Sequence, residues 1–333
     1  MKPAGRPLRV LIPYFAGVDT FQDNVAHTLR KMGHTVETPG YKFRRQRGRV
    51  NRIVSDTIAA VFPQRWEEHE NYALSAARAF RPDLILCLTQ TLRSETLASL
   101  HDLGACLVAW WGDPPANMRG MGLLAEGWDA IFIKDEMAVK KMRAVGLNAQ
   151  LMHEAFNPDW HCPQGAPKDD TVAVVGNYYG YRQFLVSRLL DAGVELALHG
   201  FPPPRWGDRR IHQKFSGRYI TRSEKSAVFE GALASLNCTT MSEGDSLNCR
   251  AFEICGAAGL QLIEDKPSVE ACFEPGREVL AYRSVDEIVD HLARARIDRE
   301  WAKRIREEGH RRAHAAHTYK HRLEQILKAV DMA

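Results

Sequence analysis

The chain has 333 residues, which is too long for one ordinary hydrophobic core and about right for two domains. Hydrophobic residues make up 45% and charged residues 26%, as in globular proteins, and a formal net charge of only +4 does not favour wholesale binding of nucleic acid. There is no apolar run of about 18 residues, so we expect no membrane-spanning helix. The seven cysteines form no C-x-x-C pair, which favours reduced thiols in a cytoplasmic protein.

In the first half of the chain, short apolar runs alternate with amphipathic stretches. This alternation is typical of a doubly wound domain with a parallel sheet, which we place at residues 1–157. The domain has no G-x-G-x-x-G motif, so we expect no nicotinamide or flavin dinucleotide. The predicted strands are 8–13, 34–37, 84–88, 105–110 and 128–134, and the predicted helices are 24–32, 67–80, 94–103 and 136–145.

A tryptophan and an aspartate follow the predicted strand 105–110 at its carboxyl end. Trp111 and Asp113 frame a glycine, and two prolines then fix the loop. An aromatic face and a carboxylate commonly hold a sugar, and Asp113 has the chemistry of a general base. The alternative is that Trp110, the last residue of the strand, belongs to the core and that Asp113 caps a turn.

The segment Lys42–Arg52 carries six lysines and arginines and no acid. It fits a peripheral contact with anionic lipid or with an acidic acceptor, and equally a solvated loop that leads into a helix. A nucleic-acid site of this kind usually brings aromatic neighbours, so we expect none.

A linker rich in proline and charge, 158–170, leads into a second α/β domain that we place at 171–310. After its first strand, Gly176 and Asn177 let the backbone approach a ligand closely. Arg182 begins the next helix, where its guanidinium suits a bidentate grip on a diphosphate or, alternatively, faces solvent. The predicted strands are 171–175, 194–199, 232–238, 260–263, 269–273 and 278–282, and the predicted helices begin near 182 or span 223–230, 246–258, 284–293 and 301–330.

Strand, polar loop, helix and strand between 231 and 265 form a βαβ crossover in this second domain. The helix presents its N-terminal residues, Ser246 to Asn248, to the crevice at the strand ends, where free N–H groups suit a diphosphate. Arg250 adds positive charge, and Asp245 and Glu253, eight positions apart, offer carboxylates to sugar or ribose hydroxyls. The alternative is an ordinary solvated helix start whose acids suit the dipole.

The second half of the chain resembles the group-1 glycosyltransferases, and most closely their CgeB-like branch. The similarity covers about residues 170 to 330 well and the first half loosely. It implies a GT-B fold, in which two Rossmann-like domains face a cleft and a last helix, 311–333, crosses back onto the first domain. It rests on Asp245, Arg250, Phe252, Glu253, the turn Gly256–Gly259, Phe273, Gly276 and Glu278.

The resemblance also implies roles for single residues. In the E-x7-E motif of retaining GT-B enzymes, the first acid lies near the donor sugar and the second holds the ribose. Asp245 stands at the first position, where the motif has glutamate, and Glu253 at the second. We therefore expect Asp245 and Asp113 to be catalytic, and Gly17, Trp111 and His153 to face the acceptor. The expected donor-binding residues are Gly176, Asn177, Arg182, Tyr219, Ser246, Leu247, Asn248, Arg250 and Glu253.

These expectations describe a hexosyltransferase-type enzyme of class EC 2.4 that moves a sugar from a nucleotide-diphosphate sugar, UDP or dTDP, to an unidentified acceptor. The motif pair favours retention of configuration. The sequence has neither D-x-D nor H-E-x-x-H, so we expect no metal and no cofactor. Two alternatives remain on the same fold: a nucleotide-sugar epimerase, and a non-catalytic protein that binds a glycan or a nucleotide.

Overall fold

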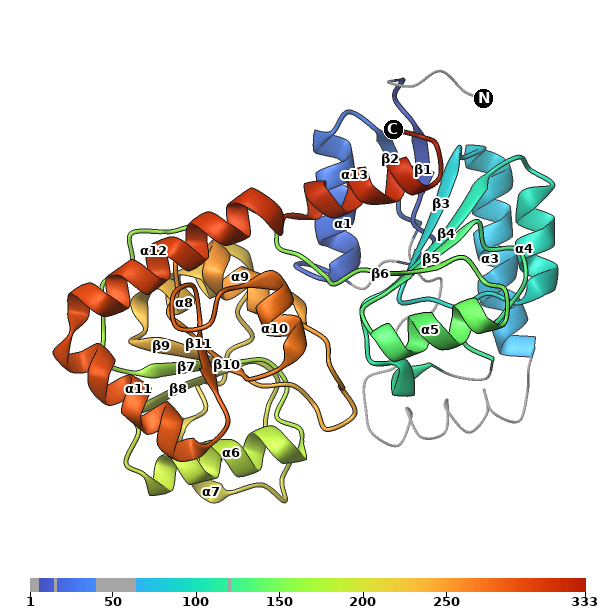
Figure 1. The fold of residues 1–333 in the computed structure, drawn as a ribbon. Coiled ribbons are helices and arrows are strands. Elements are labelled where there is room, and N and C mark those ends of the chain that lie inside the picture. Colours follow the sequence, from blue (N-terminus) through green and yellow to red (C-terminus); the bar gives the residue numbers. More distant parts are fainter. Residues whose placement is uncertain (1–5, 15–16, 40–63, 119–120) are drawn as a thin grey trace. The chain divides into compact units, whose positions relative to one another are not determined.

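The computed structural model describes residues 6–14, 17–39, 64–118 and 121–333, with only the backbone for 64–69. The basic segment Lys42–Arg52 lies outside the described residues. The chain forms two compact units: unit 1 is Met1–Met152 together with Leu323–Ala333, and unit 2 is His153–Arg322. Each unit is a parallel sheet with helices on both faces (Figure 1).

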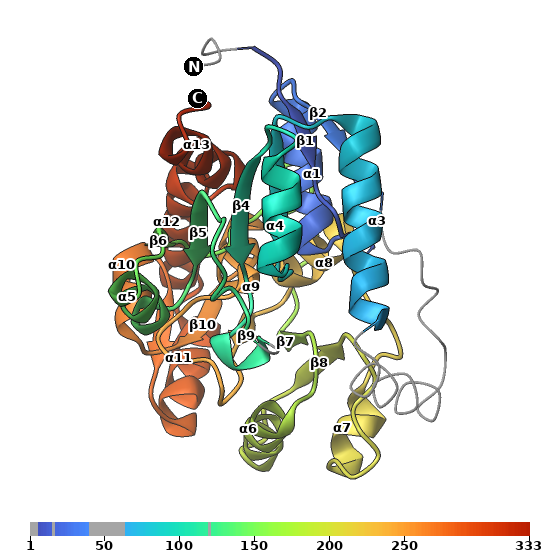
Figure 2. The ribbon, with the colours of Figure 1, turned by 90° about the vertical axis from the view of Figure 1, so that its right-hand side faces the viewer.

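Unit 1 holds a six-stranded sheet in the order β2-β1-β3-β4-β5-β6, and all five pairings are parallel. Apolar residues of α3, α4 and α5 cover one face of the sheet. Phe21 of α1 meets Trp110 of β4 edge to face, with ring centroids 4.7 Å apart. Figure 2 shows α3 and α4 standing next to each other along the sheet. The elements are β1 (Arg9–Leu11), α1 (Phe21–Lys31), β2 (Thr35–Glu37), α3 (Gln64–Phe80), β3 (Leu84–Leu88), α4 (Ser94–His101), β4 (Cys106–Trp111), η1 (Pro115–Asn117), β5 (Ala130–Ile133), α5 (Glu136–Ala144) and β6 (Ala149–Leu151).

Unit 2 holds a five-stranded parallel sheet in the order β11-β10-β9-β7-β8. One parallel bridge, Leu198 to Phe215, adds a one-residue strand beyond β8, so the chain visits the sheet in the order of a Rossmann fold. That order reverses between β7 and β9. The elements are β7 (Val172–Val175), α6 (Gly180–Asp191), β8 (Leu196–His199), α7 (Arg209–Lys214), α8 (Arg222–Gly231), β9 (Ala234–Asn237), α9 (Cys249–Gly256), β10 (Gln261–Glu264), α10 (Pro267–Cys272), β11 (Leu280–Tyr282), α11 (Val285–Ile297), α12 (Arg299–Ala316) and α13 (Tyr319–Ala329), which ends in unit 1.

Two apolar layers hold the sheet of unit 2 between its helices. Residues of α6, α7 and α11 pack with the strands in one layer. On the other side, α9 and α10 share a layer with Phe156, and Phe229 of α8 packs with Val175 and Ile254. The core therefore lies on both faces of the sheet, and the loops at the carboxyl edge of the sheet lie outside these apolar layers.

Three sequence-based expectations about elements were wrong. Residues 269–273 are not a strand, because Pro267 occupies the first turn of helix α10 and the carboxylate of Asp245 accepts from the Ser268 N–H. The predicted helix 301–330 is two helices, α12 and α13, separated at His317 and Thr318. The short elements β6 and α7 were missed, since three and six residues carry too little periodicity.

His317, at the C-terminus of α12, is held as a neutral imidazole. Its Nδ1 accepts from the Arg322 guanidinium at 3.0 Å, so the Nε2–H donates to the Cys272 carbonyl at 2.9 Å. Burial lowers the pKa of His317 to about 4, although the hydrogen bond to Cys272 opposes the shift. Protonation would place a second N–H against a cation.

We expect the stability of the protein to fall as the pH drops below about 6.5, the ordinary pKa of histidine. Between that value and the folded pKa of about 4, the unfolded chain binds a proton that the folded chain does not, so acid favours unfolding. The loss from His317 approaches about 3 kcal/mol near pH 4. Urea unfolding at pH 7 and pH 5 checks this: His317→Gln should show a smaller change than the wild type, and an equal change would contradict it.

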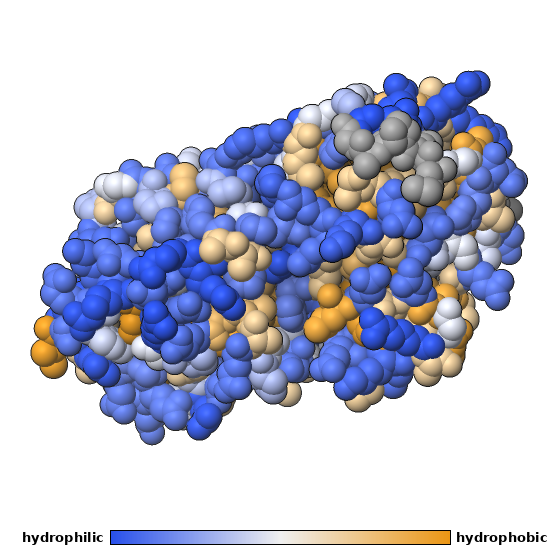
Figure 3. All heavy atoms as spheres, turned by 45° about the horizontal axis from the view of Figure 1, so that its top comes forward, coloured by the Kyte–Doolittle hydropathy of each residue, from blue (hydrophilic) through white to orange (hydrophobic). Residues whose placement is uncertain are grey.

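Hydrophilic residues cover most of the face of the molecule shown in Figure 3, with hydrophobic ones scattered singly and in small groups. In the part of the chain that the structure describes, no helix has both the length and the apolar character needed to cross a membrane.

Candidate functional site

The loops that follow β7 and β9 meet at the point where the strand order of unit 2 reverses, which is where open α/β sheets bind ligands. Gly176, directly after β7, has a φ of +128°. A Cβ at Gly176 would lie 2.7 Å from Nη2 of Arg250 and 2.9 Å from Nη1 of Arg182. The glycine therefore leaves room for two guanidinium groups to converge on the sheet edge.

Arg182 binds these two loops together. It is 1% exposed, and its Nη1 donates to the Asn177 carbonyl at 2.6 Å. Its Nη2 donates to the Cys238 carbonyl and to the Tyr179 hydroxyl, both at 2.8 Å, and its Nε donates to Cys238 Sγ. We predicted that the Arg182 guanidinium grips a phosphate with two donors. In the structure, most of its donors are instead hydrogen-bonded to groups of the protein.

Two tyrosines stiffen the same loop. Burial raises the pKa of both Tyr178 and Tyr179, so their hydroxyls remain donors. Tyr179 donates to the Cys238 carbonyl at 2.7 Å, and Tyr178 lies 3.3 Å from the His199 carbonyl. Neither tyrosine was predicted, because one aromatic residue among several near a glycine gives no specific sequence signal.

Arg250, in the first turn of α9, is the half-buried guanidinium of the site. Its Nη1 donates to Asn237 Oδ1 at 3.2 Å, and the side chain of Asn248 donates to the same oxygen at 3.2 Å. Asn237 is the last residue of β9 and was not predicted. It orients Arg250 beside Gly176 and leaves the rest of that guanidinium for a ligand.

The N-terminus of α9 is capped by the protein. Asn248 is the N-cap and accepts from the Ala251 N–H at 3.2 Å. The Cys249 N–H donates to Glu154 Oε2 at 3.1 Å, and the Leu247 N–H lies 3.4 Å from Nδ1 of His153. Side chains from 153–154 thus already contact the N–H groups of Leu247 and Cys249, and the Glu154 carboxylate offsets the helix dipole. A diphosphate role for Ser246 to Asn248 stays a prediction.

Glu253 lies on the second turn of α9 and is 4% exposed. Its Oε1 pairs with Nζ of Lys225 at 2.9 Å and lies 3.7 Å from Nε2 of His161. The predicted ribose acid is thus a buried member of an ion pair. The ion pair was not predicted, because Lys225 is a single lysine in a predicted helix and nothing in the local sequence indicates its partner.

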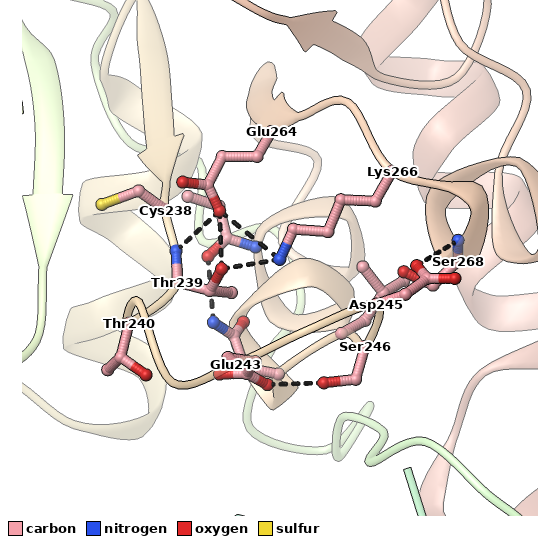
Figure 4. Close-up of polar contacts among 12 residues, drawn as sticks. Cys238, Thr239, Thr240, Glu243, Asp245, Ser246, Glu264, Lys266 and Ser268 are labelled. Carbon is pink, nitrogen blue, oxygen red and sulfur yellow. Dashed lines mark hydrogen bonds and ion pairs between the residues drawn. The ribbon is translucent and has the colours of Figure 1, made fainter. Parts of the chain in front are cut away.

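Asp245, the predicted sugar-side acid, belongs to the loop between β9 and α9 and contacts the first turn of α10. Its Oδ1 accepts from the Ser268 N–H at 2.8 Å, as Figure 4 shows. Ser246, its neighbour, is buried and donates its hydroxyl to Glu243 Oε1 at 2.9 Å. Asp245 therefore fixes the loop after β9 to α10, the helix that follows β10.

An exposed aromatic pair lies beside the Gly176 loop. The rings of Phe201 and Tyr219 are 4.7 Å apart, and the two side chains are 52% and 55% exposed. Gly200, which precedes Phe201, approaches so closely that a Cβ there would lie 2.2 Å from the Gly176 carbonyl oxygen. The pair thus stands at the carboxyl edge of β8, which packs closely against the Gly176 loop.

Unit 1 contains three of the predicted residues, Gly17, Trp111 and Asp113. Gly17, with a φ of +130°, follows β1, and the exposed Asp113 follows β4. Trp111 is only 5% exposed, and its indole N–H donates to the Pro114 carbonyl at 3.3 Å. The prediction of Trp111 as an open sugar platform is corrected, because its ring belongs to the core of unit 1. His153 belongs to unit 2, where it contacts the loop before α9.

Two parallel α/β units with Rossmann-like strand order place the chain in the GT-B fold class of glycosyltransferases. Residues 182–328 match the model of a protein family described as glycosyl transferase-like. The matched segment covers less than half of the chain and lies mostly in unit 2. No curated protein matches the sequence.

Several solved structures share the fold at low sequence identity. Sucrose-phosphate synthase from Thermosynechococcus elongatus superposes with a TM-score of 0.65 at 13% identity, over 98% of this chain and 99% of that one. Anabaena HepE, solved in complex with UDP and glucose, gives a TM-score of 0.65 at 10% identity, over 97% and 100% of the two chains. AviGT4, a glycosyltransferase of avilamycin A biosynthesis, gives 0.62 at 13% identity, over 98% and 97%.

Proposed function

We propose that the protein transfers a sugar from a nucleotide-diphosphate sugar to an acceptor, with retention of configuration, as an enzyme of the CgeB-like branch. The observation that carries the proposal is the convergence of two guanidinium groups on Gly176 at the reversal point of the unit 2 sheet. The neighbour HepE binds UDP and glucose on the same fold. All seven cysteines are free, which is consistent with a reducing compartment such as the cytoplasm.

The proposal assigns each part of the donor to residues along this edge of unit 2. Phe201 and Tyr219 offer aromatic faces to a base, and Arg250 offers charge-assisted donors to the diphosphate. Arg182 acts as a positioning residue for the phosphate loops rather than as a ligand. Glu253, which is paired with Lys225, is the acid to which we assign the ribose hydroxyls. The acceptor is proposed to meet the loops of Gly17 and Asp113.

Developing negative charge on the leaving diphosphate needs stabilisation, and fixed cations aimed at it supply this without a metal. Arg250 is held at that position by Asn237, and the sequence has no D-x-D clamp. We therefore propose metal-independent transfer. Turnover that survives EDTA unchanged would support the proposal, and turnover that requires added Mg²⁺ would contradict it.

We predict that Arg250→Met weakens diphosphate binding by about tenfold or more, because a charge-assisted hydrogen bond is lost. The measurement is titration calorimetry with UDP, dTDP, GDP, CDP and ADP, without metal and then with Mg²⁺. Arg188→Met, an exposed arginine on α6, is the matched control and should bind like the wild type. If no nucleotide binds the wild-type protein, the glycosyltransferase proposal fails.

A non-catalytic nucleotide-binding protein is the second candidate, and the engagement of Asp245 by α10 favours it. Such a protein would bind a nucleotide sugar and neither transfer nor hydrolyse it. An epimerase on the same fold would instead convert the donor without any acceptor. Incubation with labelled UDP-glucose, followed by analysis of the nucleotide sugar and of free sugar, separates these outcomes.

A further inference from the structure

A cavity of about 440 Å³ opens at the carboxyl edge of β9, β10 and β11 in unit 2. Tyr181 and Thr239 line it, and these are the neighbours in sequence of Arg182 and Cys238. Arg182 donates to the Cys238 carbonyl and so joins the loops after β7 and β9. The cavity therefore adjoins these two loops. Its volume is in the range of small-molecule sites.

One wall of the cavity is a fixed polar network around Glu264. Oε2 of Glu264 accepts from the Thr239 N–H at 2.9 Å and from the Thr239 hydroxyl at 2.6 Å. Lys266 donates to the same hydroxyl at 2.6 Å and lies 3.5 Å from Glu264 Oε2 (Figure 4). Burial, together with the Glu264 carboxylate as charge and hydrogen-bond partner, raises the pKa of Tyr181 to about 12. Glu264 is therefore occupied by the chain and forms scaffold.

The loop after β9 carries two acids, and they have different surroundings. Asp245 accepts from the Ser268 N–H and does not line the cavity. Glu243 lines the cavity, and the buried Ser246 hydroxyl donates to its Oε1 at 2.9 Å. The loop thus uses Asp245 as its anchor and presents Glu243 to the cavity.

The chemistry of the lining suits a neutral ligand with several hydroxyls. Three carboxylates, Glu243, Glu264 and Asp265, stand against two cations, Lys266 and Arg283, and Arg283 is already paired with Asp265 at 2.5 Å. This balance disfavours a further anion. Carboxylates accept strong hydrogen bonds from sugar hydroxyls, and the Tyr181 ring offers an apolar face to sugar C–H groups.

We propose that this cavity receives the sugar of the donor, that the sugar is a neutral hexose, and that Glu243, not Asp245, binds one of its hydroxyls. The proposal rests on the proposed function, which places the diphosphate at the adjoining loops. It assigns the specificity-determining acid to a residue two positions before the one that the motif indicates.

The test is titration calorimetry with UDP, UDP-glucose, UDP-galactose, UDP-glucuronate, dTDP and dTDP-glucose on wild type, Glu243→Gln, Asp245→Asn and Glu270→Gln. We expect a neutral hexose to improve affinity over the bare diphosphate, and glucuronate not to. Glu243→Gln should weaken hexose-nucleotide binding about tenfold and leave the bare diphosphate unchanged. Glu270, exposed on α10 and outside the cavity, is the matched control.

Each alternative result has a separate meaning. The affinity for a hexose nucleotide is divided by the affinity for the bare diphosphate. If Glu243→Gln leaves this ratio unchanged, this proposal is overturned while the proposed function stands. The same follows if glucuronate improves affinity as much as glucose, or if Asp245→Asn alone removes the sugar preference. If the wild type binds neither diphosphate, the proposed function falls and this proposal falls with it.

Discussion

Replacement of Arg182 by methionine is expected to lower the free energy of unfolding by about 3 kcal/mol, or roughly 4 °C in Tm for a chain of 333 residues. The guanidinium is 1% exposed and serves the carbonyls of Asn177 and Cys238 and the Tyr179 hydroxyl. Methionine fills much of the volume, but the Asn177 carbonyl loses its guanidinium donor and the Cys238 carbonyl keeps only the Tyr179 hydroxyl. A buried acceptor without its donor is the costly half of a lost hydrogen bond. Differential scanning calorimetry measures the change.

The control for this prediction lies on the same helix. Arg188, exposed and 3.4 Å from Asp191, makes a surface ion pair, so Arg188→Met should change Tm only slightly. A variant Arg182→Met with wild-type Tm and weakened UDP binding would show that Arg182 is a phosphate ligand after all. For this reason Arg250, and not Arg182, is the clean probe of phosphate contact.

Replacement of Lys225 by methionine is expected to destabilise the protein by about 3 kcal/mol, because it leaves the carboxylate of Glu253 buried without its cation. The side chains of Lys225 and Glu253 are 11% and 6% exposed, and their charged atoms lie 2.9 Å apart. Chemical denaturation of the single and double variants tests this. Lys225→Met with Glu253→Gln should recover most of the loss, since no buried charge then remains unpaired.

A surface ion pair of the same length provides the comparison. Lys140 and Glu136 lie 3.0 Å apart with side chains 65% and 60% exposed, so Lys140→Met should cost well under about 1 kcal/mol. Equal effects at Lys225 and Lys140 would mean that the buried pair is not isolated from water. A double variant no more stable than Lys225→Met would point instead to lost packing.

Long apolar runs made most of the fold predictable from the sequence. The strand Leu84–Leu88 was predicted at its observed limits, since five buried residues follow an Arg-Pro-Asp turn. Residues 269–273 failed because Val269 and Phe273 read as strand residues, whereas the deciding feature, the capping carboxylate of Asp245, comes from another loop. The GT-B class was accessible because two α/β patterns and a set of motif residues agreed.

The site was predictable as a set of loops and not as a set of contacts. Gly176 and Arg250 do converge, as expected from their positions after β7 and at the start of α9. No local pattern shows that Lys225 pairs with Glu253 or that Asn237 holds Arg250, because these partners lie 28 and 13 positions away. The role of Arg182 depended on its burial, and the roles of both Arg182 and Asp245 depended on backbone groups distant in sequence, which a spacing rule does not contain.

The bond between Glu154 and the Cys249 N–H bears on where unit 2 can be cut from the chain. It joins residues 95 positions apart and completes the first turn of α9. A fragment that begins at 171, where the apolar pattern of the second half resumes, would lack this acceptor and lose about 1 kcal/mol of capping. A fragment of unit 2 that keeps this cap therefore starts at or before Glu154, inside what reads in sequence as the end of the first domain.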